Sequence, residues 1–337
     1  MQTRQAFDSF VKPNRAQIAV VTVNWNGWQN SLACLQALRA SVGPSWHLIL
    51  VDNASEDDSV FHLSGLGHDV TLIRSNINGG WTGGNNLGVQ RALEDGYEFV
   101  FLLNNDAFVR PDTLSILMMH LLKNIERLPI LGPVHRETGR QQYSFVGTTR
   151  DRGTGFWSWT PPDKVQPTDL HESFETCWIK GAGIFAHRAH FEKVGLFDER
   201  FFLDFDEIDW CYRATNAGYS LIMIRDAIID HVGYASLGSR TSPLHTYFMT
   251  RNKLLFAEKH LSLGQRILVL RKLWWDARRM SGNLPTRLTL LQFLTARSGL
   301  TATLRRGMLD YIFRRFGDCP AIVRQWNLEV MREVEDS

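Results

Sequence analysis

The sequence predicts an α/β fold, in which a mostly parallel, twisted sheet is flanked by helices. Short apolar runs alternate with amphipathic segments of helical length from Gln17 onward, which is the pattern of βαβ units with right-handed crossovers. Three of the apolar runs end abruptly in polar residues. From residue 245 to the end, the pattern is mostly helical and is broken at Pro285, so we expect a helical C-terminal extension.

The elements follow in a clear order. Apolar runs predict strands over 18–25, 47–53, 70–75 and 98–106, and amphipathic runs predict helices over 31–41, 85–96 and 112–124. Residues 133–177 are rich in Gly, Thr, Trp and Pro with weak periodicity, so we expect loops and edge strands there. A helix over 206–219 and a strand over 221–233 complete the predicted sheet region.

Composition excludes several classes of protein. The 337 residues are 44% hydrophobic and carry a formal net charge of +2, which gives no support to nucleic-acid binding. The four cysteines are widely separated and favour reduced thiols over a zinc site or a disulfide framework. Residues 1–16 read as an N-terminal extension without the apolar core of a signal peptide, and no run reaches about 18 apolar residues. We therefore expect a cytoplasmic protein.

Three predicted strands end in candidate ligand-binding residues. In doubly wound sheets, ligands bind outside the carboxyl ends of the strands, so these residues should lie at one edge. They are Thr22, Val23, Asn24 and Asn26 after the first strand, Asp52 and Asn53 after the second, and Asn104, Asn105 and Asp106 after the fourth. Asp52 can hydrogen-bond a ribose or base there, or can simply cap a turn in "DNASEDDS".

A loop rich in glycine and asparagine, "SNINGGWTGGNNLG", follows the third predicted strand. Its paired glycines permit positive φ and close approach of the backbone to a ligand. Asn85 and Asn86 are expected at the start of a helix, where they could cap it or face a bound group. The candidate binding residues are Asn78, Gly80, Trp81, Gly84 and Asn85, and a plain flexible loop is the alternative.

Asp106 is the candidate metal ligand, since Mg²⁺ and Mn²⁺ often bind through one or two carboxylates plus substrate phosphates. The alternative is that it initiates a turn before Pro111. A nicotinamide enzyme is disfavoured because the first turn, "NWNGWQN", lacks the G-x-G-x-x-G that cradles a pyrophosphate. The phosphate-binding sequence GxxxxGK[ST] is absent from the chain as well.

Six segments in order resemble the family 2 glycosyltransferases, most closely the rhamnosyltransferase-like branch that builds bacterial polysaccharides. The resemblance covers about residues 17–259 and is carried by "VVTVNWNG", "LVDNAS", "NINGGWTGGNNLG", "FLLNNDAFVRPDTL", "GAGIFAHRAHFEKVGLFDERFF" and "DEIDWCYRATNAGY". It implies a GT-A domain over 17–260, with a nucleotide-binding half over 17–110 and an acceptor-binding half over 111–260. Residues 261–337 form a separate basic, amphipathic helical region.

The resemblance also assigns roles. The residues after the first two strands, together with the Gly-Asn loop, would hold the nucleotide. Asn104-Asn105-Asp106 replaces the family's Asp-x-Asp, so Asp106 with Asn104 would bind Mn²⁺ or Mg²⁺. Glu207 is the general-base candidate, with Asp206 second. The acceptor and diphosphate side would be formed by Gly181, Ala182, Gly183, Asp209, His231 and Arg251, although Asp209 could instead pair with Arg213 at i+4.

These residues predict an inverting glycosyltransferase. It would move a sugar, with rhamnose from dTDP-rhamnose as the favoured donor, to a saccharide or lipid-linked acceptor. Inversion requires a carboxylate near the acceptor hydroxyl, opposite the departing diphosphate. A non-catalytic sugar-nucleotide-binding or scaffold protein on the same fold is the alternative, because the metal segment lacks one acid.

The C-terminal region combines basic and apolar residues. In "RILVLRKLWWDARRM", five apolar residues fall on one side of a helix, namely Ile267, Leu270, Leu273, Trp274 and Ala277. Such a helix can lie on an anionic membrane surface, or can pack on its own domain or on a second copy of the chain. The first possibility predicts a peripheral protein on the inner face of the cytoplasmic membrane.

Overall fold

Two compact units make up the chain. The computed structural model describes residues 17–139, 143–150, 157–159, 170–233, 242–280 and 282–335. The predicted extension, residues 1–16, lies outside them. The first unit takes its described residues from Met1–Thr149, Trp157–Asp198 and Glu207–Gly233, and the second from Arg150–Phe156, Glu199–Asp206 and Tyr234–Ser337. The domain boundary at residue 260 stays a prediction, while the helix that ends at His260 belongs to the second unit.

Parallel strands form one half of the large sheet in the first unit. Its strands are β1 (Ile18–Asn24), β2 (Trp46–Asp52), β3 (Val70–Arg74) and β4 (Phe99–Leu103). β1 lies between β4 and β2, and β3 pairs with β2 at the edge. Because these strands run in the same direction, the residues that end β1, β2 and β4 meet at one edge of the sheet, as the sequence predicts.

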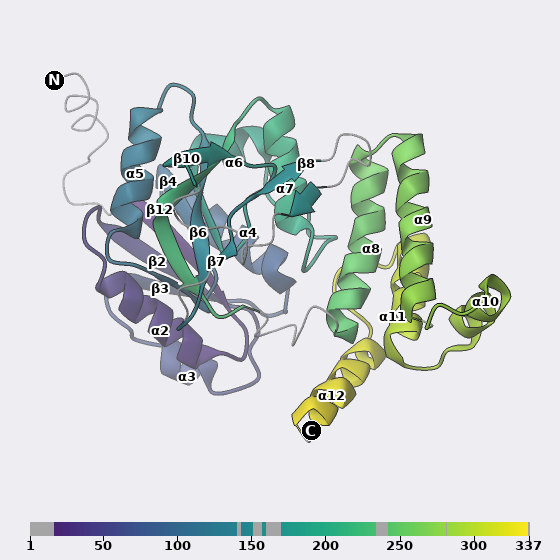
Figure 1. Ribbon diagram of the computed structural model, residues 1–337. Helices are drawn as coiled ribbons and strands as arrows, with labels where there is room; N and C mark the ends of the chain where they lie inside the picture. Colours follow the sequence, from purple (N-terminus) through teal and green to yellow (C-terminus); the bar gives the residue numbers. More distant parts are fainter. Residues whose placement is uncertain are drawn as a thin grey trace. The chain divides into compact units, whose positions relative to one another are not determined.

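The other half of the sheet is mixed. β11 (Gly183–His187) runs antiparallel between β4 and β6 (Ile130–Glu137), and β6 runs parallel to β12 (Leu221–His231). The full order is β10-β12-β6-β11-β4-β1-β2-β3, and Figure 1 shows this sheet with β2, β4, β6 and β12 labelled. β10 (Ser173–Glu175) is the short strand at its edge, and β5 (Ala107–Val109) and β7 (Tyr143–Phe145) pair with β12 and β6. β8 (Thr148–Arg150) and β9 (Trp157–Trp159) form a separate pair.

The position of β6 corrects one prediction. Residues 133–177 are expected to form loops and edge strands, yet β6 is a buried central strand that contains Gly132 and Pro133. A Cβ on Gly132 would lie 2.6 Å from Ile179 Cγ2, so only glycine fits beside that side chain. The β6–β12 register is also interrupted between Ile224 and Ile228.

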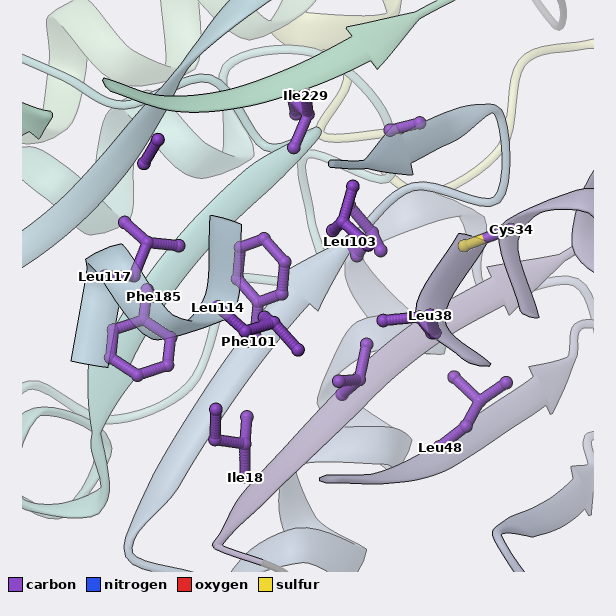
Figure 2. Packing of buried hydrophobic residues seen from close by; sticks show 14 of the residues in the cluster. Ile18, Cys34, Leu38, Leu48, Phe101, Leu103, Leu114, Leu117, Phe185 and Ile229 are labelled. Atoms are coloured by element: carbon purple, nitrogen blue, oxygen red, sulfur yellow. The ribbon is translucent and has the colours of Figure 1, made fainter. Parts of the chain in front are cut away.

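Helices cover both faces of the sheet. α2 (Trp28–Arg39), α3 (Ser59–Leu63) and α5 (Thr113–Lys123) pack on one face, and α4 (Gly80–Glu94), α6 (Arg188–Val194) and α7 (Asp206–Asn216) contribute to the other. Along β1, Ile18 faces the first cluster and Ala19 the second, as the two-residue period of a strand requires. Figure 2 shows the first cluster, in which Leu114 and Leu117 of α5 lie near Phe101 and Phe185.

The second unit is helical, as predicted. It contains α8 (Pro243–His260), α9 (Leu263–Met280), α10 (Thr286–Thr295), α11 (Gly299–Ile312) and α12 (Ala321–Glu335), and Pro285 caps α10. The apolar side predicted for α9 is partly buried and partly exposed. Leu273 and Ala277 are buried, whereas Ile267 is 52% and Leu270 is 50% exposed. Part of that side therefore packs within the protein.

Candidate functional site

The ends of β1 and β2 are joined by a buried hydrogen-bond network. Asn24 Nδ2 donates to Asp52 Oδ1 at 3.1 Å and to Ser55 Oγ at 3.1 Å. Ser31 Oγ in turn donates to Asn24 Oδ1 at 2.8 Å. Asn24 and Asp52 are fully or almost fully buried. The network fixes the Asp52 carboxylate at the sheet edge, and its serines were not singled out from the sequence because nothing in their local pattern marks them.

Asn26 organises the turn beside this network. It adopts a left-handed backbone with φ 49°, and its side-chain oxygen accepts hydrogen bonds from the amides of Glu56 at 2.7 Å and Asp57 at 3.4 Å. Asparagine tolerates this conformation better than most residues. Asn26 therefore ties the β1–α2 turn to the β2–α3 loop, which is a shaping role for a residue predicted to bind nucleotide.

The Gly-Asn loop is held by the side chains of Asn53, which follows β2, and Asn78. Asn53 Nδ2 donates to Asn78 Oδ1 at 3.0 Å and to the Gly80 carbonyl at 2.9 Å, and Asn53 Oδ1 accepts from the Gly79 amide at 3.0 Å. Gly80 has φ 70°, in the left-handed region that glycine adopts easily. The loop is thus ordered by hydrogen bonds, in contrast to the alternative of a flexible loop.

Helix α4 begins earlier than predicted, and its packing accounts for residues that were predicted to bind a ligand. It starts at Gly80, so Asn85 and Asn86 lie in its second turn rather than at its start. Asn85 Nδ2 donates to the Trp81 carbonyl at 2.9 Å. A Cβ on Gly84 would lie 2.6 Å from Val23 Cγ1. Gly84 is therefore needed for the close approach of α4 to β1, where it packs on Val23.

Asn86, expected from the sequence to cap a helix or face a bound group, bonds instead to the protein backbone. Its side chain exchanges two hydrogen bonds, each 3.0 Å long, with the backbone N–H and carbonyl of Phe197. This ladder joins α4 to the segment after α6. Both groups are buried, so the pair stabilises this face of the first unit.

Asp106 and His231 meet at the end of the sheet. His231 is the last residue of β12, and its Nε2 lies 3.2 Å from Asp106 Oδ1. The side chains are 5% and 9% exposed. Burial is the largest single influence and would raise the pKa of Asp106, but the hydrogen bond and charge of His231, a backbone hydrogen bond and the nearby Lys180 together hold the pKa below its usual value. The carboxylate is therefore kept ionised.

The two asparagines before Asp106 form hydrogen bonds with neighbouring side chains. Asn104 Oδ1 accepts a hydrogen bond from Trp81 Nε1 at 2.8 Å. Asn105 Nδ2 donates to Ser31 Oγ at 3.2 Å. Asn104 thus fixes Trp81 while its oxygen keeps a second lone pair, so its role as a metal ligand stays a prediction. Asn105 links this strand end to α2.

A metal at this edge would have Asp106 as its carboxylate ligand, with Asn104 and His231 beside it. Within the described residues, no group of three or more His, Cys, Asp or Glu side chains is arranged to hold a metal ion. One carboxylate and one imidazole nevertheless suit a cation whose remaining ligands are phosphate oxygens and water. The donor set thus fits a metal that arrives with a nucleotide diphosphate.

His135 packs against His231, and the sequence analysis did not predict it as part of the site. The two rings are 5.7 Å apart in an edge-to-face arrangement. His135 is fully buried, and neither ring nitrogen has a hydrogen-bond partner in the described part of the chain. Burial and the nearby Lys180 lower its pKa well below the usual value, so the ring is neutral.

The segment Gly181-Ala182-Gly183 lies beside the end of β4. The Asn104 amide donates to the Ala182 carbonyl at 3.4 Å, and a Cβ on Gly181 would lie 2.7 Å from Trp81 Cζ2. A Cβ on Gly183 would lie 2.7 Å from Pro133. These small residues let the segment approach Trp81 and β6 closely. Packing alone therefore explains why they are small, whether or not a ligand binds beside them.

The three acids of α7 have different surroundings. Asp209 is fully buried and forms an ion pair with Arg213 Nε at 2.9 Å, which confirms the i+4 pairing. This contact replaces the acceptor role predicted for Asp209. Glu207 is half-buried and belongs to the first unit, whereas Asp206 is buried and belongs to the second. Glu207 is therefore the more accessible of the two base candidates.

Arg251 does not face a ligand. It lies in α8 of the second unit, is fully buried, and donates to the carbonyls of Gly317 at 2.6 Å and Phe201 at 2.9 Å. The prediction that it contacts the diphosphate or acceptor is therefore corrected. A lone arginine gives no sign in the sequence of which carbonyls it will meet after folding.

The sequence is similar to those of known glycosyltransferases. Residues 19–185 match the family model "Glycosyl transferase family 2". "dTDP-rhamnosyl transferase RfbF" of Shigella flexneri is 24% identical over 225 residues, which cover 64% of this chain and 71% of that protein. "N-acetylglucosaminyl-diphospho-decaprenol L-rhamnosyltransferase" of Mycobacterium tuberculosis is 25% identical over 224 residues, with 62% and 67% coverage.

Solved structures share the fold. "GalNAc-T7 with UDP, GalNAc and Mn2+" superposes with a TM-score of 0.58 at 14% identity over 90% of this chain, which spans only 59% of that longer chain. The mannosyltransferase PcManGT from Pyrobaculum calidifontis gives 0.53 at 15% identity and covers 93% of this chain and 94% of that one. Residues 19–185 are therefore a family 2 glycosyltransferase domain with the GT-A fold, similar to rhamnosyltransferases, and the chain is a glycosyltransferase.

Proposed function

We propose that this protein is an inverting glycosyltransferase that moves a sugar from a nucleotide diphosphate to a saccharide or lipid-linked acceptor of a bacterial cell-surface glycan. The observation that carries the proposal is the Asp106–His231 pair at the same sheet edge as the Asn24–Asp52 network. One end of that edge offers groups for a base and ribose, and the other offers an ionised carboxylate beside an imidazole.

The donor would lie along this edge. Asp52, whose carboxylate is fixed by Asn24, is placed to accept hydrogen bonds from a ribose or base. The relatives named for dTDP-rhamnosyl and L-rhamnosyl transfer support dTDP-rhamnose as the donor. Trp81, held by Asn104, supplies an indole face near the small residues of β11, where a sugar could stack.

Asp106 and His231 would hold a divalent cation together with the donor diphosphate. The neighbouring folds solved with Mn²⁺ support this cofactor. When bound, such a cation neutralises charge that develops on the departing diphosphate. The ionised state of Asp106, maintained by His231, is the form that can bind it.

Glu207 would act as the general base. Its carboxylate would take the proton from the acceptor hydroxyl while that oxygen attacks the anomeric carbon of the sugar. The bond from that carbon to the diphosphate oxygen breaks on the opposite side, so the configuration inverts. Asp209 is excluded from this role by its ion pair with Arg213.

A thermal-shift panel tests the donor site. UDP, GDP and dTDP are each added with and without Mn²⁺, and the proposal expects one of them, with dTDP favoured, to raise the melting temperature in a Mn²⁺-dependent manner. Asp106→Asn should abolish the Mn²⁺-dependent part. A panel in which no nucleotide shifts the melting temperature would contradict the proposal.

We also propose that α10 attaches the protein to an anionic membrane surface on the cytoplasmic side. Four of its leucines, Leu288, Leu290, Leu291 and Leu294, are 47 to 61% exposed. From Ala277 to Leu309 the sequence has six arginines and no Asp or Glu. Exposed leucines flanked by arginine suit an anionic bilayer interface. None of the helices in the described residues is long and apolar enough to cross a membrane.

Flotation with vesicles tests this attachment. Vesicles rich in phosphatidylserine should bind the protein in low salt, whereas vesicles of phosphatidylcholine alone should not. Leu291→Gln with Leu294→Gln should weaken binding about tenfold or more. Wild-type protein that stays unbound, or that sediments as a dimer through these leucines, would contradict membrane attachment.

A further inference from the structure

A strained loop immediately precedes the acids of α7. Three of its residues adopt positive φ without being glycine: Phe202 at 65°, Asp204 at 63° and Phe205 at 70°. Such conformations are rare for bulky side chains and cost about 1–3 kcal/mol each. They persist only where surrounding contacts impose them. The loop leads directly into Asp206 and Glu207, the residues proposed to handle the acceptor proton.

Asn252 of α8 holds the loop by its backbone. Its Nδ2 lies within hydrogen-bond distance of three carbonyls: 2.9 Å from Phe201, 2.7 Å from Leu203 and 2.8 Å from Asp204. An amide nitrogen carries only two hydrogens, so one of them is shared. Both Asn252 and its partners belong to the second unit, and Asn252 is fully buried.

Arg251 completes the clamp. Its guanidinium donates to the carbonyls of Arg200 at 3.3 Å and Phe201 at 2.9 Å, and its Nε donates to Asn252 Oδ1 at 3.0 Å. The last bond orients the Asn252 amide so that its nitrogen faces the loop. Arg251 and Asn252, neighbours in one helix, thus bind four backbone carbonyls between residues 200 and 204.

Side chains of the loop are anchored to the same helix. Phe202 stacks on Phe248 with ring centroids 5.5 Å apart, and Asp204 Oδ2 lies 3.2 Å from His245 Nδ1. Phe205 packs against Phe256 at 5.8 Å. The loop therefore follows α8 over several turns and has little freedom to relax from its left-handed conformation.

We infer that Arg251 and Asn252 are positioning residues, which force the loop over residues 199–205 into the strained conformation in which the chain enters α7 at Asp206, the residue before Glu207. The inference rests on the proposed general-base role of Glu207. It gives the Arg251-Asn252 pair a function distinct from ligand contact and explains why both side chains are completely buried.

Hydrogen exchange tests the clamp without any assay of transfer. In Asn252→Asp, a carboxylate replaces the amide donor and repels the loop carbonyls. Amides of residues 202–205 should then exchange at least about tenfold faster than in the wild type. Tyr311→Phe is the matched control, because it removes a 2.7 Å hydrogen bond to Glu258 in the same unit but leaves the loop contacts in place. Equal exchange in wild type and Asn252→Asp would overturn the clamp.

Two substitutions at one position test its consequence for turnover and avoid the buried residues. Asp204→Asn keeps a residue that tolerates positive φ, whereas Asp204→Gly releases the strain. We expect kcat to stay within about threefold for Asp204→Asn and to fall about tenfold or more for Asp204→Gly, with unchanged KM for the donor and undiminished thermal stability. A merely structural role predicts no such loss.

The hydrogen-exchange and turnover experiments distinguish failure of the clamp from failure of the proposed function. Wild-type kcat in Asp204→Gly, or an equal loss in both variants, would overturn the positioning role. A wild-type protein that transfers no sugar would refute the proposed function instead, and the exchange experiment would then decide alone whether the clamp exists.

Discussion

The Asp106 carboxylate and the His231 imidazole lie 3.2 Å apart although 124 residues lie between them in the chain. β5 and β12 bring them together, since Ala107 pairs with His231 in an antiparallel register and the Val232 amide donates to the Asp106 carbonyl at 3.0 Å. Backbone hydrogen bonds on both sides therefore fix the pair before any ligand binds. This relationship ties the proposed chemistry to the topology of the sheet.

His231→Gln should weaken the binding of a nucleoside diphosphate with Mn²⁺ by about 10- to 100-fold, because it removes both a ligand and the group that keeps Asp106 ionised. Isothermal titration calorimetry with and without Mn²⁺ measures the effect. His68→Gln, at an exposed histidine, is the control and should bind as the wild type does. Unaltered affinity in His231→Gln would show that His231 has no part in the site.

Gly88→Ala should destabilise the first unit by about 1–3 kcal/mol, since a Cβ there would lie 2.2 Å from Val21 Cγ1 and force α4 away from β1. Gly83→Ala, in the same helix, is the matched control. Its Cβ would meet nothing within 4 Å, so the change should stabilise by about 0.5–1 kcal/mol. Urea unfolding measures both, and equal effects would contradict the packing argument.

Asp209→Asn should lower the free energy of unfolding by about 3 kcal/mol, because it leaves Arg213 without its buried partner. We expect little change in kcat of the folded fraction, measured at a temperature well below the melting transition. A large loss of kcat with normal stability would instead restore Asp209 as a candidate for the chemistry.

His190 makes stability depend on pH. Burial lowers its pKa to about 4, and the neutral ring is held by a 2.9 Å hydrogen bond from the His187 amide to Nδ1 and a 2.7 Å contact of Nε2 with the Leu128 carbonyl. The ring binds a proton more readily when the chain is unfolded, so its contribution is complete above about pH 6.5 and is lost as the pH falls toward 4.

The loss should approach about 3 kcal/mol, since one pKa unit corresponds to about 1.4 kcal/mol. Chemical denaturation between pH 7 and 4 measures it. In His190→Gln, this part of the pH dependence should disappear, whatever the overall stability of the variant. An unchanged slope would show that another group titrates.

Local pattern was sufficient to predict much of the fold. β1, β2 and α5 follow from uninterrupted apolar or amphipathic runs, and the polar residues after β1, β2 and β4 do meet at one edge. β6 could not be predicted in this way, because Gly132 and Pro133 argue locally against a central strand. The side chains of Ile179 and Met223, distant in sequence, explain why glycine is needed there.

The same limit applies to the site. Asp106 and His231 could each be suspected from residue type, and their contact confirms that the fold brings them together. Arg251 could not be placed, because its partners are backbone carbonyls of residues 200, 201 and 317 that carry no sequence signal. Backbone strain at Phe202 and Phe205 is likewise invisible in a sequence, since phenylalanine gives no hint of positive φ.

Transfer by Glu207→Gln tests the central claim most directly. The wild type and the variant are incubated with dTDP-rhamnose, Mn²⁺ and a saccharide or lipid-linked acceptor, and release of dTDP is followed while calorimetry measures dTDP binding. The account predicts that kcat falls by about 10²- to 10⁴-fold in the variant while dTDP binding is retained. Undiminished transfer by Glu207→Gln would contradict it.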